Sequence, residues 1–223
     1  MGHGPVSIPH FPFSLLSALL LVILFLLIKI QVIKYAFERI GIHHRSLFLL
    51  LLLSLMGSYV NIPLWQIPAV IPPCLIGPSR FWTWFGPSAL TARTTVAINL
   101  GGAVIPVLIS FRLMTKAPSP GKTTLATLIV AFIVYASSRP VPGVGITVPS
   151  LLPPLCAALI SLLIEGHATP QTAYIAGSIG TLIGADLANL PIFAWLGIST
   201  ASIGGAGTFD GIFLSGLIAA LLA

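Results

Sequence analysis

Two of the four acidic residues of this chain, Asp186 and Asp210, lie inside long apolar stretches. A carboxylate in such surroundings is costly unless it is paired, protonated or facing water, and by default it marks a functional site. Two carboxylates brought together can share one proton, so that one acts as a base toward water and the other as an acid toward a carbonyl group. That is the chemistry of aspartic proteolysis. An ion pair with an arginine is the non-catalytic alternative.

The composition predicts a membrane protein. Of the 223 residues, 57% are hydrophobic and only 6% are charged, whereas about 25% of residues are charged in a typical soluble domain. We expect an all-α, polytopic transmembrane helix bundle that forms a single membrane domain over residues 1–223. Cys74 and Cys156 lack the spacing of a metal or redox site, so neither a metal nor a cofactor is predicted.

A spanning helix needs about 20 mostly apolar residues. This template predicts seven spans: Phe13 to Ile33, Ser46 to Trp65, Ala89 to Met114, Thr123 to Ser137, Val148 to Ile164, Gln171 to Pro191 and Ile203 to Ala223. They group into a first span with a basic cytoplasmic segment (1–45), spans two to four (46–137) and spans five to seven (138–223). The fifth carries three prolines and is expected to be kinked or only partly inserted.

The basic residues predict an orientation. If the spans alternate, one side collects seven of the ten: Lys29, Lys34, Arg39, Arg45, Arg112, Lys116 and Lys122. The positive-inside rule places that side in the cytoplasm, with the N-terminus outside and the C-terminus inside. The net charge of +6 therefore encodes orientation, and the lipid bilayer, not nucleic acid, is the expected partner. The oligomeric state is left open.

The two aspartates fall at similar depths in this topology. At 1.5 Å per residue, Asp186 lies roughly 8 Å below the outer boundary and Asp210 roughly 10 Å below it. If the last two helices are neighbours, as sequential elements usually are, the carboxylates can face each other.

Several other residues are candidates to support or bind at this site. Asn99 places an amide near the middle of the third span. Such an amide usually forms a hydrogen bond between packed helices, and direct contact with a ligand is the rarer alternative. Thr208 can cap the last helix, which would place Asp210 in its first turn. The full set of supporting candidates is Gly184, Gly205, Gly207, Thr208, Asn99, Asn189 and Arg139.

The motifs Arg139-Pro-Val-Pro-Gly-Val-Gly, Leu182-Ile-Gly-Ala-Asp186-Leu and Ser202-Ile-Gly-Gly-Ala-Gly-Thr-Phe-Asp210-Gly resemble a prokaryotic membrane family, domain-of-unknown-function family 1614. The likeness covers about Ala89 to the C-terminus and implies no established activity.

A more distant likeness is to intramembrane aspartyl proteases of the presenilin and signal-peptide-peptidase type, which place one Asp in each of two successive helices. It implies catalytic roles for Asp186 and Asp210. Those enzymes carry Tyr-Asp and Gly-x-Gly-Asp, whereas here Ala185 and Leu187 flank the first aspartate and Thr208-Phe209 precede the second.

Three functions remain open at this point. The first is a di-aspartyl intramembrane protease acting on a transmembrane peptide. The second is a proton- or ion-coupled small-molecule transporter, favoured by an inverted pairing of spans two to four with spans five to seven that sets Asn99 and Asp186 in equivalent middle helices. The third is a non-catalytic structural or assembly protein, because fold alone constrains function loosely.

The charge distribution makes a first testable prediction. Reporter domains fused to the two termini should be active outside the cytoplasm at the N-terminus and inside it at the C-terminus. A C-terminal fusion that is active only outside the cytoplasm would contradict both the orientation and the depth estimates.

Overall fold

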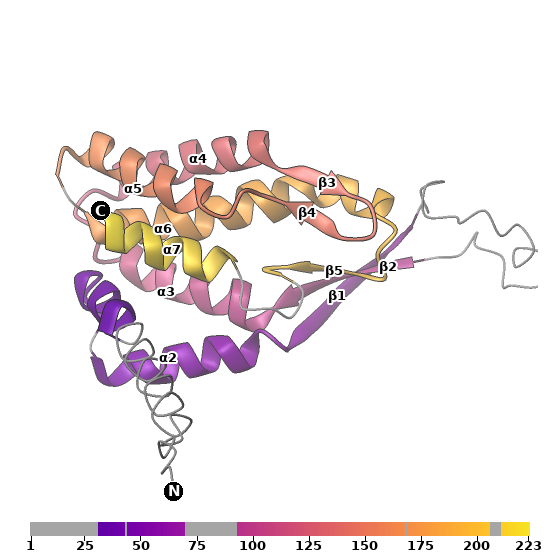
Figure 1. Ribbon diagram of the computed structural model, residues 1–223, viewed down its shortest axis with the longest axis horizontal. Helices are drawn as coiled ribbons and strands as arrows, with labels where there is room; N and C mark the ends of the chain where they lie inside the picture. The colour runs from indigo at the N-terminus through magenta and orange to yellow at the C-terminus, as the bar shows by residue number, and fades with distance from the viewer. Residues whose placement is uncertain (1–30, 43, 70–92, 168, 206–210) are drawn as a thin grey trace, which may run out of the picture.

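The computed structural model describes residues 31–42, 44–69, 93–167, 169–205 and 211–223, and these are mostly helical (Figure 1). Residues 31–39 are helical. The helices that follow are α2 (His44–Gly57), α3 (Ile105–Met114), α4 (Pro120–Ser137), α5 (Leu152–Glu165), α6 (Pro170–Thr181) and α7 (Gly211–Leu222). Most of the predicted first span, Phe13 to Ile33, lies outside the described residues.

Helix α6 is the centre of the bundle and packs against α3, α4, α5 and α7. Nearly all of its residues are buried. Its glycines allow the close approach: a Cβ atom at Gly180 would lie 2.8 Å from a Val130 methyl group on α4, and one at Gly177 would lie 3.0 Å from the Ser215 carbonyl oxygen on α7. Small residues on this helix therefore let its neighbours approach at backbone distance.

Two of the described helical segments are long and apolar enough to cross a membrane. They are α4, with 18 residues, and the continuous helical stretch Pro170–Trp195, with 26 residues. The predicted spans Thr123 to Ser137 and Gln171 to Pro191 fall within them. In the fifth predicted span, Pro153 and Pro154 lie in the first turn of α5, where proline is tolerated, so they begin that helix instead of kinking it.

A three-stranded sheet replaces helix in two of the predicted spans. Strand β1 (Asn61–Pro68) is antiparallel to β2 (Arg93–Asn99), which is parallel to β5 (Thr200–Ile203), in the order β1-β2-β5. The prediction of helix is therefore wrong over residues 61–65 and 93–99, as is the purely α-helical class. Proline at 63 and 68 stops a helix but is accepted on an edge strand such as β1.

Strand β2 has the sequence RTTVAIN, in which β-branched side chains dominate, and these pack well on a pleated sheet. Its last residue is Asn99, so this amide does not lie in the middle of a spanning helix. The expected equivalence of Asn99 and Asp186 in inverted middle helices is therefore wrong.

A short hairpin, β3 (Arg139–Val141) with β4 (Gly145–Thr147), connects α4 to α5. The hairpin and the three-stranded sheet gather at one end of the helices (Figure 1). The opposite end is joined by polar contacts. There the Arg39 guanidinium donates to the Leu221 carbonyl oxygen at 3.1 Å, and Lys122 Nζ lies 3.9 Å from Glu165 Oε2.

The contact between Gly184 and α4 predicts a stability difference. A Cβ atom at position 184 would lie 2.3 Å from the Ala131 carbonyl oxygen, so Gly184→Ala should destabilise the protein by about 1–3 kcal/mol through overpacking. The matched control is Gly121→Ala on α4, where a Cβ atom meets nothing within 4 Å. Denaturant unfolding of the two variants should separate them, and equal stabilities would refute the close packing.

Candidate functional site

Asp186 lies where the helical stretch after α6 changes geometry twice. Residues Leu182–Asp186 form one turn of π-helix, and Leu187–Trp195 continue as 3₁₀-helix. Pro191, inside the 3₁₀ segment, has no N–H to donate. Single π turns within helices occur often at functional sites, because they re-aim side chains and free backbone groups.

Asn189 binds the carbonyl groups at this change of geometry. Its Nδ2 donates to the Ala185 carbonyl oxygen at 2.8 Å and lies 3.1 Å from that of Gly184. It also lies 3.0 Å from Ser138 Oγ at the end of α4. The amide is buried and stabilises the helix break, so Asn189 supports the site by shaping the backbone.

The Asp186 carboxylate holds the turn after β5. Its Oδ2 accepts a hydrogen bond from the Gly204 N–H at 2.7 Å. Gly204 has φ +89°, and a Cβ atom there would lie 2.6 Å from Ala103, so only glycine fits. This hydrogen bond connects the π turn after α6 to the turn after β5, 18 residues further along the chain.

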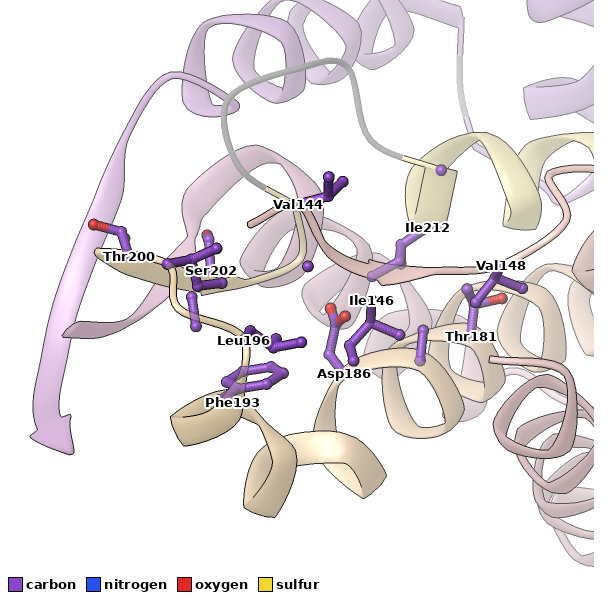
Figure 2. Close-up of a pocket in the computed structure, with 16 residues that line it drawn as sticks. Val144, Ile146, Val148, Thr181, Asp186, Phe193, Leu196, Thr200, Ser202 and Ile212 are labelled. Atoms are coloured by element: carbon purple, nitrogen blue, oxygen red, sulfur yellow. The ribbon is translucent and has the colours of Figure 1, made fainter. Parts of the chain in front are cut away.

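Asp186 also lines a cavity of about 250 Å³. Figure 2 shows its carboxylate directed into the space between Ile146 of β4 and Leu196. The remaining walls combine hydroxyl and apolar side chains from four parts of the chain. The lining residues are Val144, Gly145, Ile146, Val148, Thr181, Ala185, Asp186, Phe193, Leu196, Ile198, Thr200, Ala201, Ser202, Gly205, Gly211 and Ile212.

Asn99 belongs to a polar cluster beside this cavity. Its Oδ1 accepts from the Gly102 N–H at 2.7 Å and so caps the π turn Leu100–Val104 that leads into α3. Its Nδ2 donates to the Ser58 carbonyl oxygen at 2.6 Å and to Asn61 Oδ1 at 3.0 Å. Asn61 Oδ1 also accepts from Ser202, and Ser202 lines the cavity. Asn99 is therefore a buried cap that reaches the cavity through Asn61.

The other candidates divide into three groups. Gly205 lines the cavity, and Gly184 packs against α4. Arg139 is exposed on β3 and lines a separate cavity with Thr147 and Leu152. Gly207, Thr208 and Asp210 lie outside the described residues, so the expected pairing of Asp186 with Asp210 stays a prediction.

Two features of the described chain were missed by sequence reasoning. The first is the hairpin β3–β4, which forms a wall of the Asp186 cavity. The second is Glu165, which is buried at the end of α5. The Thr172 hydroxyl donates to its Oε1 at 3.2 Å. The Gly166 C-cap after Glu165 was the available signal for that helix end.

The sequence profile of a family described as protein of unknown function (DUF1614) matches residues 55–222. The chain belongs to this family. The matched region of this DUF1614 protein contains the whole Asp186 cavity, the sheet and helices α3 to α7. No curated protein and no solved structure matches the chain.

The contact between Asp186 and Gly204 in this DUF1614 protein predicts a graded stability effect. Asp186→Ala leaves the buried Gly204 N–H without this acceptor and should cost about 1–3 kcal/mol. Asp186→Asn keeps an acceptor oxygen at the same position and should cost less. Unfolding curves and hydrogen exchange of the Gly204 amide measure both effects, with the exposed Glu38→Ala as control. Wild-type stability and exchange in Asp186→Ala would contradict the contact.

Proposed function

We propose that this protein is a multi-pass membrane carrier that binds a small solute, with a coupling proton or ion, at the Asp186 cavity. The observation that carries the proposal is the partly buried Asp186 carboxylate, which lies at a helix break and faces a cavity of about 250 Å³. The multi-pass topology keeps the predicted orientation, with the N-terminus outside and the C-terminus in the cytoplasm.

The surface of the bundle supports the membrane location. Large apolar side chains on the outward faces of the helices are exposed, with Phe132 on α4 71% exposed, Leu163 on α5 71% and Phe111 on α3 72%. Extended apolar surface of this kind is rare on soluble monomers and is typical of contact with lipid. The contact of Arg39 with Leu221 supports the orientation, because it sets a residue of the basic side beside the C-terminus.

Interrupted helices around one cavity favour a carrier. The stretch from α6 passes through π- and 3₁₀-helix at Asp186, and α7 begins at the cavity residue Gly211. The strand β5 supplies the wall between them. Irregular backbone at membrane depth is tolerated where it is buried in protein or lines a cavity, and transporters use such breaks to bind substrates and coupling ions.

The chemistry of the walls defines the class of solute. An ionised carboxylate only accepts hydrogen bonds, so Asp186 selects a cation or a hydrogen-bond donor. The lining also includes two residues with hydroxyl groups, Ser202 and Thr200, and apolar residues such as Ile146 and Phe193. The proposed solute is therefore small, with a cationic or donor group and an apolar part.

A second candidate, di-aspartyl hydrolysis of a transmembrane peptide, is kept for one reason. Gly211 lines the cavity, and the residue before it in the sequence is Asp210. In that mechanism one carboxylate would deprotonate a water molecule and the other would protonate the substrate carbonyl oxygen.

Transport by reconstituted protein tests the carrier. In proteoliposomes with an imposed pH gradient, uptake should be found within a panel of small amines, amino acids and nucleosides. Asp186→Asn, which removes the charge and preserves the size, should lower the initial rate by at least about tenfold, as loss of a charged hydrogen bond does. Glu38→Gln removes an exposed carboxylate that pairs with Lys34 and should leave the rate unchanged.

The same variants separate the alternatives. Wild-type uptake by Asp186→Asn would remove the carrier proposal. Cleavage of a reconstituted transmembrane peptide library, abolished alike in Asp186→Asn, Asp210→Asn and the double variant, would establish the hydrolase, because such non-additivity marks residues that act as a unit. Loss of stability without either activity would favour the structural role.

A further inference from the structure

Helices α3 and α4 leave an apolar groove between them. Each packs against α6, but the two make little contact with one another. Ile175, Ile179 and Ile183 form the floor of the groove at four-residue spacing, so the floor is about 12 Å long. The walls are Val107, Ser110, Phe111 and Met114 from α3, and Thr124, Thr127 and Leu128 from α4. The enclosed volume is about 320 Å³.

The mouth of the groove is positively charged. Met114 and Thr124 line the groove where α3 ends and α4 begins, and the exposed residues Arg112, Lys116 and Lys122 lie close to this connection in the sequence. Lys122 lies 3.9 Å from Glu165. Within the described residues, no carboxylate forms an ion pair with Arg112 or Lys116. Two cations at the mouth are therefore available to an anion.

One polar group inside the groove has no partner. Ser110 is 3% exposed, and its hydroxyl makes no hydrogen bond with the described protein atoms. It lies one helical turn from Met114 at the mouth. A buried hydroxyl without a partner is costly, and an acceptor oxygen brought to this wall by a ligand would lower that cost.

We propose that the groove binds one anionic glycerophospholipid, with an acyl chain along the isoleucine floor, an ester oxygen at Ser110 and the phosphate at Arg112 and Lys116. The inference rests on the membrane location in the proposed function, but it does not involve Asp186. Basic residues at the cytoplasmic ends of membrane helices attract anionic headgroups, and the expected orientation puts this mouth on the cytoplasmic side.

Native mass spectrometry tests the site on the full chain, released from nanodiscs that contain equal amounts of phosphatidylglycerol and phosphatidylcholine. The wild type should retain one phosphatidylglycerol. The double variant Arg112→Gln, Lys116→Gln should weaken this binding by roughly thirtyfold, because each cation near a membrane surface contributes about a factor of five. The control, Lys34→Gln with Arg93→Gln, makes the same change of charge away from the groove and should retain the lipid.

Groove-filling variants locate the acyl chain. The substitutions are Val107→Trp on one wall and Leu128→Trp on the other. Both replace exposed side chains, so the protein should still fold while the groove is blocked. Both variants should lose the bound lipid. Equal retention of the two lipids by the wild type would overturn the site, as would wild-type retention by the double variant or by both tryptophan variants.

This outcome is separate from that of the carrier. Asp186→Asn should retain phosphatidylglycerol as the wild type does, whether or not it transports. Lipid binding without transport would contradict only the proposed function. Transport without lipid binding would contradict only the lipid site.

Discussion

The backbone groups freed at the end of α6 are the constraint on which the site depends. Where α-helix gives way to π- and 3₁₀-helix, carbonyl groups lose their usual partners, and in apolar surroundings each needs a replacement. Asn189 binds the Gly184 and Ala185 carbonyl groups from one side. On the other side, Asp186 accepts the N–H of Gly204. Asn189 therefore replaces the lost partners of the carbonyl groups, while Asp186 joins the break to the turn after β5, and the break lies on the wall of the cavity.

The helical stretch that begins with α6 carries one row of glycines and one row of isoleucines, and the two rows have different neighbours. Gly177, Gly180 and Gly184 lie on faces that α7 and α4 approach at backbone distance. Ile175 and Ile179 lie on a face that α3 and α4 only flank, so bulky side chains remain at the base of a groove. Where the residues are glycines, neighbouring helices pack closely against the backbone. Where they are isoleucines between two separated helices, they form an apolar surface for another molecule. The same stretch therefore organises both the bundle and the groove.

The sequence predicted the helices better than the end of the bundle that holds the cavity. The positions of α4, α5 and α6 followed from long apolar runs, whereas the prolines in their first turns, which mark where the helices begin, were not used to place them. Strand β2 did not, because hydropathy alone cannot distinguish a short buried strand from part of a spanning helix, and only the run of Thr, Val and Ile indicated it. Asp186 was identified by the rarity of acidic residues. Gly204, which donates to Asp186, could not be identified from the sequence. The position of Gly204 depends on the pairing of β5 with β2, a strand about 100 residues earlier in the chain.

A comparison of two turns separates what Asp186 does for stability from what its charge adds. Strands β2 and β5 run parallel, with Ile98 beside Ile203. A Gly-Gly-Ala sequence lies near the end of each strand, at 101–103 within the π turn after β2 and at 204–206 directly after β5. After β2, the turn is completed by Asn99, a neutral amide that accepts the Gly102 N–H. After β5 the turn begins with two glycines, and Asp186 supplies the acceptor from another segment. Asn99 shows that an amide oxygen is sufficient for this capping task. The Gly204 N–H therefore does not itself require a charged acceptor. In the proposed carrier, the negative charge of Asp186 instead serves the bound cation, hydrogen-bond donor or proton in the cavity.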